Sequence, residues 1–104
     1  MAALGIIETK GFAAALAAAD AMMKAATVST YIGGKAPIHT NGLIALFVKA
    51  ADVGSVKAAI EAGAEAAKSL GGVASVHVIA AANDAAAKAL GVDPTPAAPP
   101  GDWG

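Results

Sequence analysis

The sequence predicts an α+β domain of the ferredoxin-like type, in which a split β-α-β unit occurs twice. The expected product is a four-stranded antiparallel sheet with helices on one face and a short additional helix at the C-terminus. Two observations carry this prediction. Runs rich in β-branched residues alternate with longer alanine-rich runs, in the order strand, helix, strand, strand, helix, strand, helix. Glycine pairs and one polar loop separate most of these runs.

The first unit begins with Leu4–Thr9, a short apolar run that predicts a buried or half-buried strand. Phe12–Ala26 is predicted to be helical because alanine, the strongest helix former, recurs throughout it. The larger side chains of this helix recur at helical spacing and are predicted to form its buried face: Phe12, Leu16, Ala19 and Met23. Thr27–Ile32 is rich in β-branched residues and predicts the second strand.

A polar, turn-forming stretch, Lys35–Gly42, follows the second strand. Pro37 cannot donate a hydrogen bond to a sheet, and the Asn41-Gly42 pair readily adopts a positive φ. We therefore expect a shaped loop at the tip of a hairpin. The apolar run Leu43–Lys49 predicts the third strand, which pairs back onto the second.

The second unit opens at Asp52, a favourable N-cap residue, and continues into a helix over Val53–Leu70. The apolar face of this helix is predicted from its helical spacing: Val53, Val56, Ile60, Ala64 and Ala67. Val73–Ile79 predicts the fourth strand. Asn83 is a candidate N-cap for a short third helix, Asp84–Leu90.

Composition narrows the class of function. The net charge of −1 and the absence of arginine argue against a nucleic-acid partner or an anionic membrane surface. Without cysteine there is no disulfide, thiolate metal site or cysteine nucleophile. We expect no signal peptide and no membrane span, because Glu8 and other polar residues interrupt the apolar runs. Only 14% of residues are charged, which suggests that self-association covers much of the surface.

No self-contained active site is visible. His39 lies in the polar loop and His77 lies in the fourth strand, where a structural or interface role is the simpler interpretation. Neither histidine has a second ligand nearby in sequence, so no metal is expected. Glu8 could be paired with Asp52 or Glu61 as catalytic carboxylates, but nothing in their spacing favours it. The glycines match no phosphate-binding motif, so no cofactor is expected either.

The composition changes after residue 91. We predict one domain over residues 1–91 and a flexible proline-rich tail over residues 92–104. The only tryptophan, Trp103, lies in this tail. Two interpretations stay open: an untethered chain end, or a short peptide that docks on a partner or a neighbouring subunit.

At this point the sequence resembles a known family, the single-domain hexameric shell proteins of bacterial microcompartments. The resemblance extends over about residues 3–90, and a combination of segments in the same order carries it. The segments that match the family are Ala3–Gly11, Ala18–Ala26, Asp52–Gly63 and Ser75–Ile79.

The resemblance implies flat cyclic hexamers that tile edge to edge into a protein shell around encapsulated enzymes. It implies that the loop between the second and third strands lines a central pore for small polar metabolites. The pore-lining residues would be His39, Thr40, Asn41 and Gly42. Lys24 matches the lysine at the hexamer edge. Asp20 lies one helical turn before it, at the i, i+4 spacing that favours an ion pair. Asn83 ends the run Ala80–Asn83, which occupies the place of a second edge segment.

The chain departs from the family pattern at both sites. The pore loop is usually Lys-Ile-Gly-Ser-Gly, whereas this loop is longer and contains Pro37, His39 and Asn41. The family commonly has an arginine after the fourth strand, in a Pro-Arg-Pro-His-like run, and this chain has Ala80–Asn83 there. An extra residue also precedes Asp52.

The resulting expectation is a non-enzymatic, pore-bearing shell subunit in the cytoplasm. Its partners would be five further copies of itself, neighbouring hexamers and other shell proteins, with encapsulated enzymes as a possible addition. An oligomeric ligand-binding regulator on the same ferredoxin-like scaffold is the main alternative. A small enzyme with an active site at subunit junctions is the third hypothesis, although no convergent acid–base set supports it.

Overall fold

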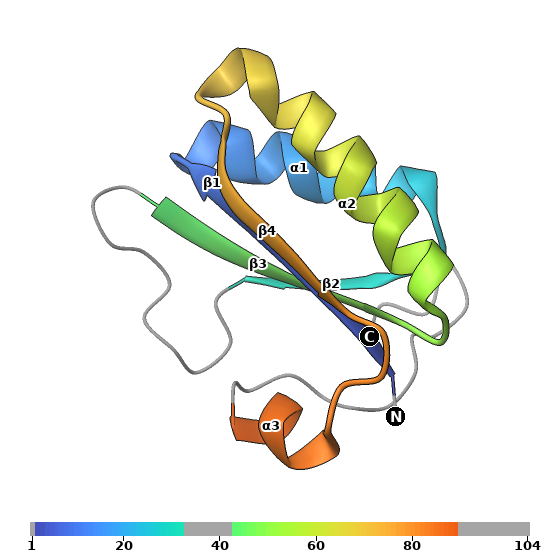
Figure 1. The fold of residues 1–104 in the computed structure, drawn as a ribbon. Coiled ribbons are helices and arrows are strands. Elements are labelled where there is room, and N and C mark those ends of the chain that lie inside the picture. Colours follow the sequence, from blue (N-terminus) through green and yellow to red (C-terminus); the bar gives the residue numbers. More distant parts are fainter. Residues whose placement is uncertain (1, 33–42, 90–104) are drawn as a thin grey trace.

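The structure, a computed structural model of the chain, describes residues 2–32 and 43–89. The order of its elements is the predicted one (Figure 1). The helices and strands are β1 (Ala3–Lys10), α1 (Phe12–Ala25), β2 (Ser29–Ile32), β3 (Leu43–Ala50), α2 (Val53–Ala67), the 3₁₀ turn η1 (Lys68–Leu70), β4 (Val73–Ile79) and α3 (Asp84–Ala89).

The four strands form one antiparallel sheet in the order β2-β3-β1-β4. The long central strands β1 and β3 pair over their full length, from Ala3 opposite Ala50 to Lys10 opposite Leu43. Helices α1 and α2 lie side by side on one face of the sheet, and α3 lies on the other side (Figure 1). The predicted ferredoxin-like α+β fold is therefore confirmed.

Alternation along the strands separates two apolar clusters. Ile7 and Val48 face α1 and α2 and belong to the main core, where both are fully buried. Leu4 and Phe47 point to the opposite face and pack with Ala82, just before α3. Because side chains of a strand alternate between faces, the neighbouring positions along β1 and β3 serve both clusters.

Helix α2 follows the prediction closely. Val56, Ile60 and Ala67 are buried in the main core, and Val53 and Ala64 are half-buried against it. The helix ends at Ala67, and the predicted continuation to Leu70 forms the tighter 3₁₀ turn η1. Such turns are common at helix ends.

Asp52 is the N-cap of α2, as predicted. Its carboxylate accepts hydrogen bonds of 2.8 Å from the backbone N–H and from the hydroxyl of Ser55. These two bonds lower the pKa of Asp52 below its ordinary value, with the backbone bond the larger cause.

The predicted buried face of α1 is wrong. Phe12 is 68% exposed, Leu16 is 72% exposed, and Met23 is also exposed, while Ala19 is half-buried against the core. The helix instead buries Ala14, Ala15, Ala18 and Met22.

Close packing against α2 explains this choice of face. A Cβ on Gly63 of α2 would lie 2.7 Å from Cγ of Met22 and 3.3 Å from the carbonyl oxygen of Ala18. On the sheet side of α2, a Cβ on Gly5 would lie 2.7 Å from Cγ1 of Val56. Because α2 is held this close to both neighbours, α1 can turn only its narrow, alanine-rich face inward.

The remaining differences lie at the ends of elements. β1 extends one residue beyond the prediction at each end, β2 begins at Ser29 instead of Thr27, and β3 extends to Ala50. The predicted loop Lys35–Gly42 and the tail lie outside the described residues. The division of the chain at residue 91 accordingly stays a prediction.

Candidate functional site

The register of the sheet gives the domain two distinct ends. At one end, which we call the loop end, Lys10 lies opposite Leu43, and the chain between β2 and β3 leaves and re-enters the sheet. The predicted pore-lining residues belong to that connection and lie outside the described residues: His39, Thr40, Asn41 and Gly42. Their flanking strands, β2 and β3, pair with each other in antiparallel register.

The other end, which we call the far end, collects several chain segments. Ala3 lies opposite Ala50, and Leu4 lies opposite Ile79. The backbone N–H of Ala82 donates a 2.8 Å hydrogen bond to the carbonyl of Ala2. Because α1 runs antiparallel to β1, its last turn with Lys24 also lies toward this end (Figure 1).

Lys24 and Asp20 form the ion pair that their spacing predicts. Nζ of Lys24 lies 2.8 Å from Oδ2 of Asp20, and both side chains are largely exposed. Such an exposed pair contributes roughly 0.3–0.5 kcal/mol to helix stability. The pair mainly fixes the position of the lysine side chain. Asp20 holds Lys24 along the surface of α1, and the remaining N–H donors of Lys24 stay open to solvent.

Asn83 is the N-cap of α3, as predicted. Its Oδ1 accepts hydrogen bonds from the backbone N–H of Ala85 at 2.9 Å and of Ala86 at 3.3 Å. The side chain is exposed at the far end of the domain. Asn83 therefore has a structural role in α3, whatever it contributes to an edge between subunits.

The carboxylates considered for catalysis are held apart. Glu8 points to the sheet face away from α1 and α2, where its Oε1 accepts a 2.6 Å hydrogen bond from Oγ of Ser75. Asp52 starts α2 at the far end and has a lowered pKa, the opposite of what a general acid requires. His77 is exposed in β4, opposite Ile6. Over residues 2–32 and 43–89, no group of three acidic, histidine or cysteine side chains could hold a metal ion.

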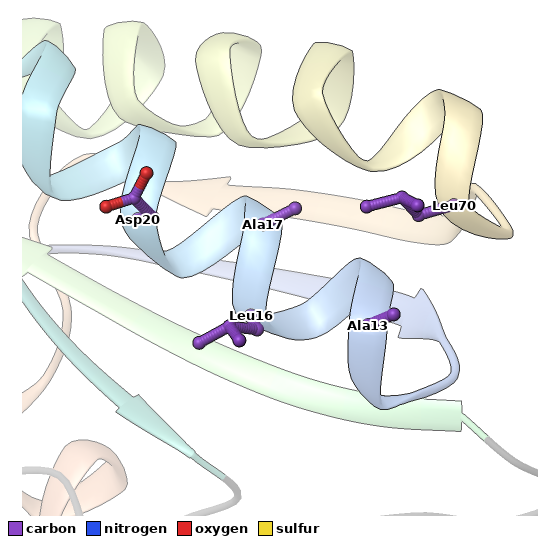
Figure 2. Close-up of a pocket in the computed structure, with 5 residues that line it drawn as sticks. All are labelled: Ala13, Leu16, Ala17, Asp20 and Leu70. Atoms are coloured by element: carbon purple, nitrogen blue, oxygen red, sulfur yellow. The ribbon is translucent and has the colours of Figure 1, made fainter.

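Sequence reasoning missed an open apolar groove on the helical layer. It lies between α1 and η1, has a volume of about 520 Å³, and is lined by Ala13, Leu16, Ala17, Asp20 and Leu70 (Figure 2). Of these five lining residues, only Asp20 carries a charge. The available signal was indirect: a second stripe of α1, formed by Ala14, Ala15, Ala18 and Met22, is mostly alanine and can approach the glycine in α2 closely, which leaves the stripe with Leu16 on the outside.

Three comparisons place the chain among known proteins. A family model described as the BMC domain matches residues 3–82. The chain is 52% identical over 77 residues to the bacterial microcompartment shell protein PduA of Citrobacter freundii, which covers 74% of this chain and 78% of that protein. It is 47% identical over 83 residues to the shell protein EutM of Escherichia coli (strain K12), covering 76% and 77% respectively.

A solved structure has the same fold. A microcompartment protein from Desulfitobacterium hafniense DCB superposes with a TM-score of 0.67 at 30% identity and covers 83% of this chain. The present chain spans only 47% of that chain, about half its length. Among the described helices, none is long and apolar enough to cross a membrane.

The family match covers most of the chain, and the curated relatives named above are shell proteins. The resemblance of the sequence to this family is thereby confirmed, as are the expected structural role and location in a cytoplasmic microcompartment. The chain belongs to the BMC-domain family of bacterial microcompartment shell proteins, and it is a structural shell subunit and not an enzyme.

Proposed function

We propose that the chain forms cyclic homohexamers that tile into the shell, with the loop around His39–Gly42 at the central axis and Lys24 at the outer edge. The observation that supports this proposal is the distance between the loop end and the far end of the subunit. The strands β1 and β3 are eight residues each, which corresponds to roughly 26 Å of sheet. One subunit can therefore present its loop end to a central axis and its far end to a neighbouring hexamer.

Sixfold symmetry gives a small loop a large effect, because each side chain occurs six times around one axis. Rings of Thr40 and Asn41 would offer neutral hydrogen-bond donors and acceptors, which favour polar or anionic metabolites over apolar ones. A ring of His39 would add positive charge to the pore in mild acid. Solute flux through reconstituted shells should therefore change between pH 8 and pH 5.5, and unchanged flux would count against this role of His39.

The edge contact would depend mainly on Lys24. The run Ala80–Asn83 provides no cation where relatives commonly have an arginine, and Asn83 already caps α3. Lys24 remains as an exposed cation on the last turn of α1, oriented by Asp20. Such a group could hydrogen-bond to carbonyl oxygens across an edge between hexamers.

Electron microscopy of concentrated protein tests this function. We expect hexagonally packed sheets or tubes from the wild-type chain. Lys24→Ala should reduce sheet formation while the hexamer persists, and Lys57→Ala, which removes an exposed lysine from α2, serves as the matched control. A monodisperse trimer that binds a small effector and never associates further would overturn the proposal in favour of a regulator.

The shell family implies that the chain assembles with other shell proteins. Contact with encapsulated enzymes would be a further role of the hexamer face that points into the lumen. Co-purification of cargo with wild-type shells, compared with shells that lack this subunit, measures that contact.

A further inference from the structure

Lys10 is the last residue of β1 and lies at the loop end of the sheet. It pairs with Leu43, the first residue of β3, so the connection between β2 and β3 re-enters the sheet directly beside it. The pairing of β1 with β3 is unbroken from Ala3 to Lys10, so side chains alternate between the two faces along the whole strand. Lys10 therefore points to the face away from α1 and α2, as Glu8 does, and its side chain is exposed.

The backbone at Lys10 is held on both sides. On one side the antiparallel ladder joins it to β3. On the other side its N–H donates a 3.0 Å hydrogen bond to the carbonyl of Gly72, in the turn between η1 and β4. Gly71 lies so close that a Cβ there would clash with the carbonyl oxygen of Lys10. The base of the lysine is therefore fixed at the loop end, and its long stem carries the ammonium group into solvent.

The charge of Lys10 is not paired as the charges of the helical layer are. Lys24 and Lys68 each form an ion pair with a carboxylate of α1 or α2. Within the part of the chain that the structure describes, Lys10 forms no ion pair. Glu8 lies on the same face, two positions earlier in β1, and its Oε1 accepts the hydrogen bond from Ser75. Two residues of a strand span about 7 Å, so the carboxylate starts that much farther from the loop end than the ammonium group does.

We propose that Lys10 sets the charge preference of the central pore, in favour of small anionic metabolites such as carboxylates and phosphates. This inference rests on the proposed hexamer with its loop end at the axis. Six copies of Lys10 then form an inner ring of ammonium groups at the rim of the pore, and six copies of Glu8 form an outer ring of carboxylates. An anion on the axis is closer to the inner ring, so attraction exceeds repulsion.

Ionic strength determines the size of this preference. Six unit charges about 10 Å from the axis, with six opposite charges about 7 Å farther out, favour a monovalent anion over a neutral solute about fivefold in water at 10 mM ionic strength. At 1 M the Debye length is about 3 Å, and almost no preference remains. The outer ring alone would disfavour the anion about fourfold at 10 mM. Substitutions at Lys10 and Glu8 should therefore have opposite effects.

Quenching of an encapsulated fluorophore measures this preference. Shells are assembled from the full-length chain together with other shell proteins, and a small anionic quencher, iodide, or a small neutral one, acrylamide, is added from outside in a stopped-flow instrument. The measured quantity is the ratio of the iodide entry rate to the acrylamide entry rate. For the wild type this ratio should be about fivefold higher at 10 mM than at 1 M ionic strength.

Three variants separate charge from structure. Lys10→Gln should lower the ratio at 10 mM by on the order of tenfold, with acrylamide entry unchanged. Glu8→Gln keeps an oxygen that can accept the hydrogen bond from Ser75, and it should raise the ratio about fourfold. Lys57→Gln removes an exposed lysine of α2 and is the matched control, for which we expect no change.

The outcomes separate this inference from the hexamer itself. Native mass spectrometry and electron microscopy of each variant report hexamers and sheets independently of solute entry. Hexameric shells in which Lys10→Gln leaves the ratio unchanged would overturn the role of Lys10 and leave the proposed hexamer intact. Equal slowing of both quenchers would show a structural role at the loop end and overturn it as well. A monomeric or trimeric mass of the wild type would contradict the proposed hexamer, and this inference with it.

Discussion

Helices α1 and α2 lie on the same face of one sheet, yet they direct their large side chains differently. In α2, Val56 and Ile60 are buried in the core of the subunit. In α1, alanines and Met22 fill the core-facing side, and Phe12 and Leu16 point outward. The difference indicates that α2 stabilises the subunit, whereas much of the apolar surface of α1 is available to neighbours. Substitutions matched between the two helices can test this division.

The largest expected effect on the subunit comes from Ile60→Ala in α2. Ile60 is 6% exposed, and truncation of a buried isoleucine costs about 2–5 kcal/mol in lost burial and residual cavity. We expect this loss in the free energy of unfolding at every protein concentration, measured by urea denaturation. A loss below about 1 kcal/mol would show that α2 is not the core helix described here.

The contact between the helices gives the next effect. Gly63→Ala places a Cβ within 2.7 Å of Cγ of Met22, and such overpacking costs about 1–3 kcal/mol, partly offset by the higher helix propensity of alanine. We expect a net loss of about 1–2 kcal/mol in unfolding free energy. Combining it with Met22→Ala should cost less than the sum of the single changes, because the clash disappears. Additive costs would mean that the helices are not in this contact.

Leu16→Ala is the counterpart of Ile60→Ala on α1. Because Leu16 is exposed in the subunit, its truncation should change the unfolding free energy of the dissociated chain by less than about 0.5 kcal/mol. It should instead weaken association, so that the melting temperature of the oligomer falls and becomes more dependent on protein concentration. Sedimentation equilibrium across a dilution series measures this shift. An unchanged dissociation midpoint would place Leu16 outside the interface between subunits.

The smallest effect concerns the start of α2. Hydrogen bonds from Ser55 lower the pKa of Asp52 in the folded state, so the folded protein binds this proton less readily than the unfolded chain. The stabilisation is present above the unfolded pKa of about 3.9 and is lost as the pH falls through the lower folded value. Asp52→Asn keeps a capping oxygen that does not titrate. The difference in melting temperature between wild type and Asp52→Asn should therefore change between pH 6 and pH 3, and a constant difference would contradict the cap.

The sequence predicts features that depend on near neighbours. The caps at Asp52 and Asn83 and the pair of Asp20 with Lys24 all depend on spacings of two to four residues, and each forms as expected. The order of strands and helices along the chain follows from the sequence of β-branched and alanine-rich runs. Such local patterns are informative because the interacting groups are fixed by the helix or strand itself.

The face of α1 depends on a distant residue and could not be read in the same way. Two stripes of α1 have helical spacing. The stripe with Phe12 and Leu16 has the larger side chains, so it was predicted to face the core. The opposing glycine in α2, Gly63, decides the matter by bringing the helices together. In a chain that assembles, a stripe of apolar side chains at helical spacing predicts that this stripe is buried. It does not say whether the subunit's own core or a neighbouring subunit buries it. The pore residues follow only from family resemblance, because their loop lies outside the described residues.

Native mass spectrometry of the full-length wild type beside Leu16→Glu tests most directly the claim that the apolar stripe of α1 joins subunits. A carboxylate buried in an apolar interface without a partner is strongly unfavourable, whereas on an exposed helix surface it is tolerated. The wild type should appear at six times the chain mass. Leu16→Glu should appear at the mass of one chain, with the circular dichroism spectrum of the folded subunit unchanged. A Leu16→Glu protein that remains hexameric would contradict the claim.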